Sequence, residues 1–265
     1  MDMNQRLEKS NTFSLLTGSK MSQKSFPLDL GTNEADKKNL LSLGYKGLFV
    51  PGSAKEICKL PDRRAYRSMS RSSVLLSKVG LELSEWVTAI TAESPYKVGI
   101  YAALSNGPED YEVVSALKDT DPADFATSYK KLRSPKHYLK QLPNLAPAQL
   151  GIFLNARGPV GTYTHPEHGA VHAAEAAWFD LKQGLVDAVV VCASFSLEDP
   201  LLNAKTKEMH PKSQLAEGAA AWFVTKDDAD DLIKLSYVPA SEGKPHYGAA
   251  HSLIEHLKDL ELKKH

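Results

Sequence analysis

Cysteine is scarce in this sequence, with only two residues in a chain of 265. Two cysteines cannot build a disulfide framework, and neither belongs to a C-x-x-C pair of the kind that binds metal. Cys192 lies in an apolar run, which favours a buried and inert thiol, and Cys58 lies in a loop-like segment. The sequence therefore excludes a disulfide-stapled protein and gives no sign of a thiolate metal centre.

An excess of charge of either sign is also missing. The chain has 32 Lys and Arg against 32 Asp and Glu, so its formal net charge is zero. Nucleic-acid-binding domains usually show a basic excess, which this chain lacks. No apolar run approaches the ~18 residues of a membrane span, and the N-terminus lacks the basic and apolar regions of a signal peptide. We therefore expect a cytoplasmic protein without nucleic-acid partners.

Several catalytic motifs are absent. The chain contains no G-x-S-x-G elbow, no phosphate-binding P-loop and no G-x-G-x-x-G fingerprint. The sequence therefore does not support a serine hydrolase or a nucleotide-binding enzyme. Its 42% hydrophobic and 24% charged residues are an ordinary globular balance. A chain of this length can bury a substantial core.

The apolar pattern predicts strands that alternate with helices. This order is typical of an α/β layered fold with a mixed, mostly parallel sheet flanked by helices. We expect strands over residues 47–50, 96–104, 188–193 and 219–224, and helices over residues 68–83, 142–154 and 169–184. Residues 1–42 are polar, and we expect a flexible extension there that ends in a short helix over residues 34–43. A globular domain over 43–240 and a C-terminal helical tail over 241–265 complete the predicted organisation.

The stretch from residue 158 to residue 172 resembles the strand-to-helix turn on which a β-ketoacyl synthase carries its nucleophilic cysteine. Other motifs occur in the order found in the N-terminal half of this branch of the thiolase superfamily. They are Arg67-Ser68-Met69-Ser70-Arg71, Leu142-Pro143-Asn144, Gly158-Pro159, Glu175-Ala176-Ala177, Gly184, Asp187-Ala188 and Glu217-Gly218-Ala219-Ala220. The resemblance implies a thiolase-like fold of one N-terminal-type half over residues 43–240.

The chain departs from the family pattern at the position that carries the chemistry. Aligning Gly158 at one end and Gly184 at the other places Glu167 where the family has its cysteine. The arginine-proline-phenylalanine-aspartate segment of the family is absent, and no second half follows to supply two histidines and a lysine. Residues 244–248 faintly resemble one motif of that half, which we interpret as chance.

Glu167 has two interpretations. At the start of a helix the macrodipole and free N–H groups favour an anion, so we expect an ionised carboxylate held by backbone donors. Such a group can mimic the charge of a thiolate, but acid residues are also common in the first helical turn without any special role. A carboxylate is a poor acyl carrier, because its mixed anhydride is rapidly hydrolysed. We therefore expect no condensation by this chain alone.

His165, His168 and His172 surround this position, and the last two are four residues apart. The HExxH order of a zinc site is missing, and we expect no metal and no cofactor. Arg63, Arg64, Arg67 and Arg71 form a basic group that either docks an acidic acyl carrier protein or is a solvated helix face. Both interpretations of these arginines stay open.

The resemblance implies a chain-length factor, a non-catalytic partner that forms a heterodimer with an active ketosynthase in polyketide, polyene or fatty acid biosynthesis. It also implies that the strand over residues 188–193 pairs with its counterpart in the partner. We expect the acyl tunnel and the interface to be lined by Val160, Tyr163, His165, Glu167, Val190 and Cys192.

Two alternatives remain. One is a malonyl-carrier-protein decarboxylase that uses Glu167 and His168, with His165 and backbone N–H groups stabilising the enolate. The other is a homodimeric acyl-binding or regulatory protein. Fold resemblance alone does not decide among these functions.

Overall fold

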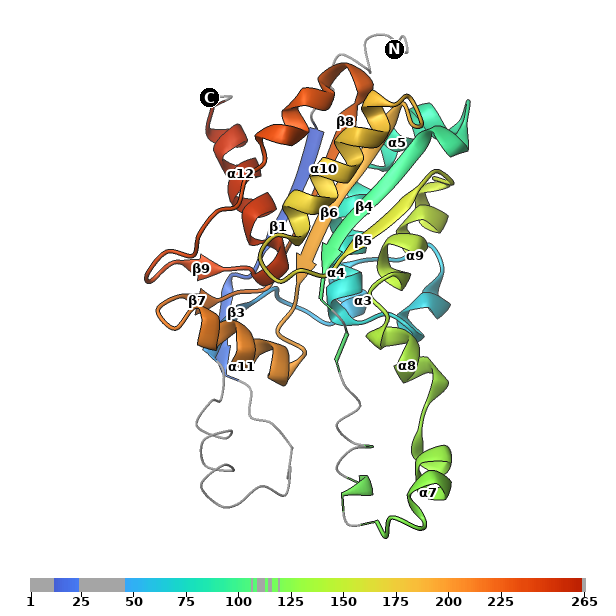
Figure 1. Cartoon of the computed structure of the whole chain (residues 1–265), viewed down its shortest axis with the longest axis vertical. Coiled ribbons are helices and arrows are strands. Elements are labelled where there is room, and N and C mark those ends of the chain that lie inside the picture. The colour runs from blue at the N-terminus through green and yellow to red at the C-terminus, as the bar shows by residue number, and fades with distance from the viewer. Residues whose placement is uncertain are drawn as a thin grey trace.

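A computed structural model describes residues 12–23, 46–105, 107–108, 113, 116–118 and 120–263. Its centre is a five-stranded sheet with the order β1-β8-β6-β4-β5 (Figure 1). The strands are β1 (Thr12–Thr17), β4 (Val98–Leu104), β5 (Val160–Tyr163), β6 (Ala188–Phe195) and β8 (Gly218–Thr225). β4 is parallel to β5 and β6, whereas β8 is antiparallel to β6 and β1. Four strands thus share one direction, which confirms the predicted mixed, mostly parallel sheet.

Helices cover both faces of this sheet. α4 (Arg71–Glu82), α5 (Ser84–Thr91) and α9 (Leu145–Leu154) pack on one face, and α10 (Gly169–Lys182) and α12 (His251–Leu262) pack on the other. The side chains of β6 alternate between these layers, as expected of a strand with two buried faces. Val189 and Val191 face the α10 layer, and Val190 and Cys192 face the α4 layer. The core is therefore continuous through the middle of the sheet.

Smaller elements surround the sheet. β2 (Lys20–Gln23) pairs with β3 (Lys46–Phe49), and β7 (Gln214–Leu215) pairs with β9 (Pro245–His246). The short helices are α3 (Ala54–Ile57), α7 (Phe125–Leu132), α8 (Pro135–Gln141), α11 (Pro200–Met209), η1 (Arg63–Arg67), η2 (Pro95–Lys97), η3 (Lys226–Lys234) and η4 (Gly248–Ala250). α7 and α8 extend beyond one end of the sheet (Figure 1). None of the helices in the described ranges is long and apolar enough to cross a membrane.

The N-terminal region differs from the prediction. Residues 12–17 form β1, which pairs with β8 in the central sheet, so the expected flexible extension is wrong for this segment. β1 is an edge strand of intermediate burial, and a short half-buried strand gives only a weak periodic signal. The strand expected near residues 47–50 forms as β3, but in the small sheet with β2. The helix expected over residues 34–43 lies outside the described residues.

Of the C-terminal segment expected as a helical tail, residues 251–262 form α12, which is not peripheral. Leu253, Ile254 and Leu257 of α12 are fully buried and belong to the core beside α10 and β8. Their spacing of one, three and four residues places them on one helical face. α12 is therefore an integral part of one of the two helical layers.

The place of β6 corrects a further prediction. β6 lies between β8 and β4, so both of its edges are already hydrogen-bonded within the chain. It has no free edge to pair with a counterpart in another subunit, and Val190 and Cys192 are fully buried in the core. β5 is the edge strand at this side of the sheet, and its Val160 is 46% exposed.

Candidate functional site: a carboxylate and histidine cluster at the turn between β5 and α10

The turn that carries Glu167 connects a strand to a helix, as predicted. β5 ends at Tyr163 and α10 begins at Gly169. A Cβ atom on Gly169 would lie 3.1 Å from the carbonyl oxygen of Tyr163, so the chain reverses here with little room for a side chain. This close approach brings the connecting residues 164–168 to the N-terminal end of α10.

Glu167 is held by side chains from distant segments. The hydroxyl of Tyr237 donates to its Oε1 at 2.9 Å, and His210 Nε2 lies 3.5 Å from the same oxygen. The side chain is 27% exposed, so water reaches it. Burial and the Glu167 contact raise the pKa of Tyr237. The carboxylate therefore lies between a phenol and an imidazole.

The backbone N–H groups that were expected to hold the Glu167 carboxylate donate to a histidine ring instead. The N–H groups of Glu167 and His168 donate to Nδ1 of His165, at 3.2 and 3.0 Å. The His165 ring thus accepts hydrogen bonds from backbone N–H groups that precede α10, as a capping side chain does. The expectation that backbone donors hold the Glu167 carboxylate is wrong, because the turn directs this side chain toward Tyr237 and His210.

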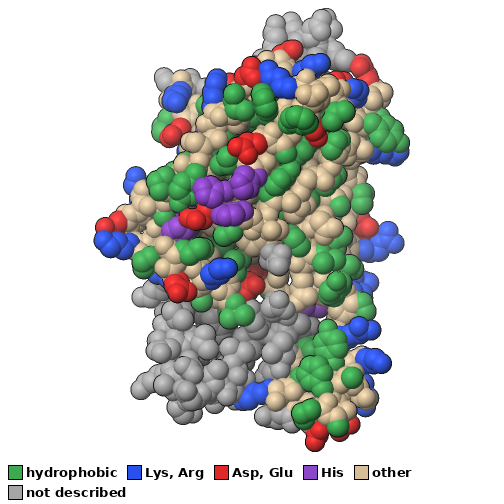
Figure 2. Space-filling model, viewed as in Figure 1, with side chains coloured by type: hydrophobic (Ala, Val, Ile, Leu, Met, Phe, Trp, Pro, Cys, Tyr) green, Lys and Arg blue, Asp and Glu red, His purple; other side chains and the backbone are tan. Residues whose placement is uncertain are grey.

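Three exposed or half-buried histidines line the outer side of the turn. The rings of His165, His168 and His172 have centroids 4.9 to 6.1 Å apart, and the ring of Tyr237 is 4.8 Å from that of His168. Figure 2 shows these histidines as one group on the face that carries α10. Among the residues that the structure describes, no three His, Cys, Asp or Glu side chains are arranged to hold a metal ion.

Three further histidines lie behind Glu167. The ring of His246 lies 4.1 Å from that of His210 and 4.4 Å from that of His251, measured between centroids. His246 and His251 are 3% and 5% exposed, and the His210 side chain is 10% exposed. Burial lowers the pKa of His246 to about 3 and, through the same cause, lowers the pKa of His251. We call His210, His246 and His251 the inner histidines.

Most residues of this cluster carry no recognisable signal in the sequence. Tyr237, His210 and His251 belong to no motif and are far from Glu167 in sequence. The resemblance of residues 244–248 to a family motif was the one available signal, and we interpreted it as chance. The structure places His246, within that segment, beside His210, the histidine that lies near the Glu167 carboxylate.

The remaining predicted tunnel residues are divided between the surface and the interior. Val160 is exposed on β5, whereas Tyr163 is partly buried, and burial followed by the charge of Asp180 raises its pKa. Both thiols are buried away from the turn, Cys58 before η1 and Cys192 in β6. Burial raises the pKa of both thiols. Neither cysteine is therefore a ready nucleophile.

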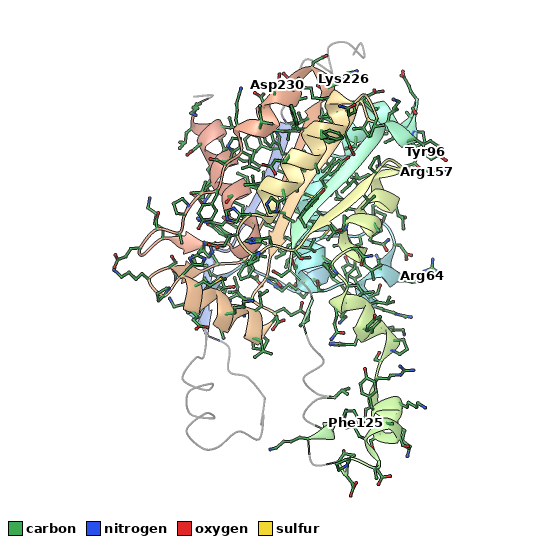
Figure 3. The ribbon with its side chains drawn as sticks, viewed as in Figure 1. Arg64, Tyr96, Phe125, Arg157, Lys226 and Asp230 are labelled. Carbon is green, nitrogen blue, oxygen red and sulfur yellow. The ribbon has the colours of Figure 1, made fainter. Side chains whose placement is uncertain are left out.

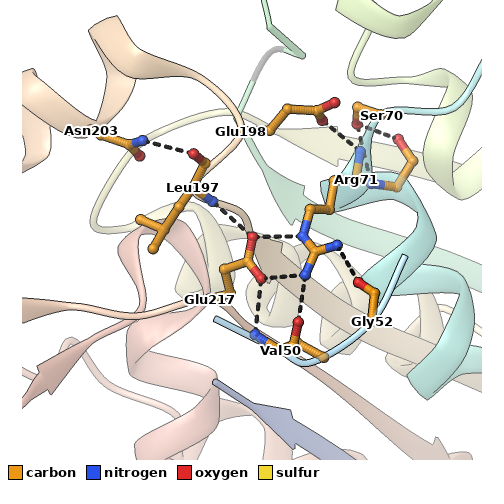
Figure 4. Close-up of polar contacts among 9 residues, drawn as sticks. Val50, Gly52, Ser70, Arg71, Leu197, Glu198, Asn203 and Glu217 are labelled. Atoms are coloured by element: carbon orange, nitrogen blue, oxygen red, sulfur yellow. Dashed lines mark hydrogen bonds and ion pairs between the residues drawn. The ribbon is translucent and has the colours of Figure 1, made fainter. Parts of the chain in front are cut away.

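Arg71 does not belong to a surface patch. Its Nε and Nη2 atoms bind the two oxygens of Glu217 at 2.7 and 2.8 Å, and it also donates to the carbonyls of Val50 and Gly52 (Figure 4). Glu217 has no exposed side-chain area and also accepts from the N–H groups of Val50 and Leu197. Carrier docking by Arg71 is thus excluded, because this ion pair uses its guanidinium.

The other three arginines are exposed on η1. Arg64 pairs with Asp62 at 3.2 Å and points away from the body of the molecule (Figure 3). Arg63 and Arg67 are exposed beside it. Of the predicted basic group, only these three residues are available to a partner.

Solved structures with the same fold include ketosynthases and their complexes. The chain is 15% identical, with a TM-score of 0.55, to a chain of the AntDE:AntF complex, described as a type II PKS acyl-carrier protein with its ketosynthase bound to the hexaketide. The match covers 84% of this chain and 65% of that chain. For the ketosynthase ApeO with its chain length factor ApeC from Xenorhabdus doucetiae, identity is 13%, the TM-score 0.52 and the coverages 82% and 57%.

A β-ketoacyl synthase from Burkholderia phymatum STM815 is 15% identical with a TM-score of 0.50, over 70% of this chain and 49% of that chain. This chain therefore spans between about half and two thirds of the length of these structures. No curated protein sequence matches it. The family model for the N-terminal domain of β-ketoacyl synthases matches residues 10–229, which include the central sheet, α10 and Glu167. The chain belongs to the family of β-ketoacyl synthase N-terminal domains.

Proposed function

We propose that this chain is a non-catalytic ketosynthase-like subunit, a chain-length factor that pairs with an active β-ketoacyl synthase and shapes its acyl tunnel. The observation that carries the proposal is the carboxylate of Glu167, held by Tyr237 and His210 in the strand-to-helix turn. The family resemblance assigns a cysteine to that position. The two cysteines of this chain are buried elsewhere, in surroundings that raise the pKa of their thiols.

The chemistry of condensation explains why the loss matters. The reaction needs a thiolate that accepts an acyl group and later leaves, and nucleophilic catalysis of this kind depends on an activated thiol. An acyl group on Glu167 would form a mixed anhydride, which water destroys. A carboxylate at this position is compatible with a structural role in which the partner supplies the nucleophile.

The surface of the chain also supports a partner. β5 is an edge strand, and unpaired strand edges readily pair with another chain. Exposed apolar side chains lie near this edge, including Ile152 at 71% and Tyr96 at 63% exposure, and Phe125 and Tyr138 are exposed on α7 and α8. Exposed apolar groups of this kind mark interaction surfaces. We propose that β5, α7 and α8 contact the ketosynthase.

Tyr163, His165 and Glu167 follow β5 into the turn, so the same partner would meet these predicted tunnel residues together with Val160. Acyl carrier protein is the second proposed partner, with docking limited to Arg63, Arg64 and Arg67. Two of the similar structures are described as complexes of a ketosynthase with a carrier protein or with a chain length factor.

Co-expression with the ketosynthase encoded beside this chain tests the proposal. We expect a one-to-one heterodimer, measured as the mass of the purified complex, and a change in product length when Tyr163 or Val160 is replaced by a smaller residue. A chain that stays monomeric or forms only homodimers in the presence of that ketosynthase would refute the proposal and favour the homodimeric acyl-binding alternative.

A second candidate is decarboxylation of a malonyl thioester, with Glu167 and His168 at the reacting group. The structure adds the Tyr237 hydroxyl as a hydrogen-bond donor beside Glu167, and such donors can stabilise a developing enolate, while His210 Nε2 lies 3.5 Å from the carboxylate without a hydrogen bond. Steady release of carbon dioxide from malonyl-carrier protein by the isolated chain, lost in Glu167→Ala, would support this activity. No release above the level of the Glu167→Ala variant would exclude it.

A further inference from the structure

The inner histidines have ring nitrogens that lack partners in the interior. Within the described part of the chain, His210 Nε2, both ring nitrogens of His246, and His251 Nδ1 make no hydrogen bond. Buried polar atoms are almost always satisfied, so a group of this kind requires an explanation. A neutral imidazole tolerates this environment much better than a charged one, because burying an unpaired charge is far more costly.

These histidines come from three separate segments. His210 follows α11, His246 lies in β9 and His251 begins α12. Their rings, which pack against one another at tilted angles, therefore join the chain after residue 237 to the body of the domain. The family match ends at residue 229, so two of the three histidines belong to a segment beyond the matched region.

We call residues 237–246 the strap. At one end of the strap Tyr237 binds Glu167, and Val238 N donates to Ser252 Oγ at 3.1 Å. At the other end, β9 pairs with β7, and Ala216 N donates to the carbonyl of His246 at 3.0 Å. Tyr237 thus places one end of the strap against the Glu167 turn, and the inner histidines lie where the other end meets the body.

The charged groups around the cluster do not balance three positive charges. Glu167 faces His210 at 3.5 Å, and on α12 the charge of Glu255 acts on His251 but is paired with Lys258 at 2.7 Å. Tyr247, which is neutral, stacks on His251 with ring centroids 6.1 Å apart. Protonated rings with centroids near 4 Å apart would repel one another strongly at low dielectric.

We propose that His210, His246 and His251 form an acid-sensitive lock, closed while the rings are neutral, that holds the strap over the Glu167 turn and releases it when they are protonated. Opening the strap removes Tyr237 from Glu167 and exposes the turn to solvent. Release is local, because Tyr247 and Ala250, which follow the strap, pack in the core beside β6 and α10 and stay with the body. The inference does not depend on the proposed function.

Hydrogen exchange measured by mass spectrometry tests the lock. After correction for the intrinsic pH dependence of exchange, we expect protection of the strap to fall about tenfold or more between about pH 7.5 and about pH 5, since each proton taken up contributes up to about tenfold per pH unit. Peptides from β4 and β6 should keep their protection. Equal loss of protection in the strap and in β6 would mean global unfolding and would overturn the proposal.

The variant His246→Phe gives the decisive comparison. Phenylalanine keeps a ring between those of His210 and His251 but cannot take up a proton. The amides of the strap should therefore stay protected from exchange at low pH. His137→Phe, on α8 and outside the cluster, is the matched control and should behave like the unmodified chain. If His246→Phe does not fold, His210→Gln replaces it with the same expectation. A strap that still opens with acid in the folded variant would refute the lock.

Discussion

At the scale of single residues, the ion pair of Arg71 and Glu217 connects three segments of the chain in the interior. It joins α4, the entry to β8 and the chain near Val50, and Glu217 has no exposed side-chain area. The sequence motif Glu217-Gly218-Ala219 indicated only the start of a strand. The structure shows that its carboxylate organises three segments.

Replacing Glu217 with glutamine should destabilise the protein strongly. The variant leaves a buried guanidinium without a countercharge, and breaking a buried pair costs about 3–5 kcal/mol. Denaturant unfolding measures the change. Glu198→Gln is the control, because Glu198 accepts only the backbone N–H of Arg71 in this network at 2.6 Å and should have a smaller effect. Equal losses in both variants would show that the ion pair is not the centre of stability.

Gly248 and Gly243 provide a second test at the residue scale. Both have positive φ, at +48° and +71°, but a Cβ on Gly248 would lie 2.2 Å from Phe195, whereas one on Gly243 would meet nothing within 4 Å. Gly243→Ala should cost about 1–2 kcal/mol for its backbone conformation. Gly248→Ala should cost about 1–3 kcal/mol more, because it overpacks the core. Equal unfolding free energies for the two variants would contradict the packing argument.

At the scale of elements, β5 decides how the chain meets a partner. Among the described strands, none pairs with its outer edge, and Val160 on it is 46% exposed. By contrast, both edges of β6 are paired, with β4 and β8, which prevents the intersubunit pairing that the sequence suggested. The order of the strands in the sheet, which determines the available edge, is a property of the tertiary structure.

Val160→Lys should weaken the proposed heterodimer while leaving the isolated chain folded. A lysine on a strand edge opposes further pairing, and we expect at least about a tenfold loss of affinity. An exposed substitution should change the unfolding free energy by no more than about 0.5 kcal/mol. Leu201→Lys on α11 is matched in exposure at 50% and should leave affinity unchanged. Equal affinities of both variants, measured by titration calorimetry, would place the interface elsewhere.

At the scale of the whole molecule, the buried histidines predict stability that falls in acid. The pKa of His246 is lowered to about 3, and burial also lowers the pKa of His251 and His256. The unfolded chain therefore binds more protons than the folded chain below its ordinary histidine pKa of about 6.5. The neutral histidines therefore make their full contribution to the free energy of unfolding above about pH 6.5. This contribution is lost as the pH falls toward about 3, the lowered pKa of His246.

Urea unfolding at two pH values measures this effect. The difference between the folded and unfolded pKa of His246 alone should lower the free energy of unfolding by about 2 kcal/mol between about pH 7 and about pH 5. His246→Phe should remove that part of the pH dependence and should be no less stable at neutral pH, because it eliminates two unpaired buried nitrogens. A pH profile of stability that is unchanged in this variant would contradict the assignment.

The sequence by itself determined the α/β class, the long buried strands and the strand-to-helix turn of Glu167. β4, β6, β8, α4 and α10 carry their own apolar periodicity, so their formation could be predicted from local pattern. β1 could not, because its short, half-buried run has little pattern without β8 beside it. The apolar run around Cys192 also indicated correctly that its thiol is buried.

Only the tertiary structure decided the surroundings of Glu167. Tyr237 and His210 lie 70 and 43 positions away in sequence, and nothing local links them to the turn. Contacts between distant segments depend on strand order and on the packing of α12 and the strap, which no periodic pattern encodes. The same packing removed Arg71 from the surface and placed β5, not β6, at the edge. Local chemistry fixed the elements, and long-range packing fixed which side chains meet.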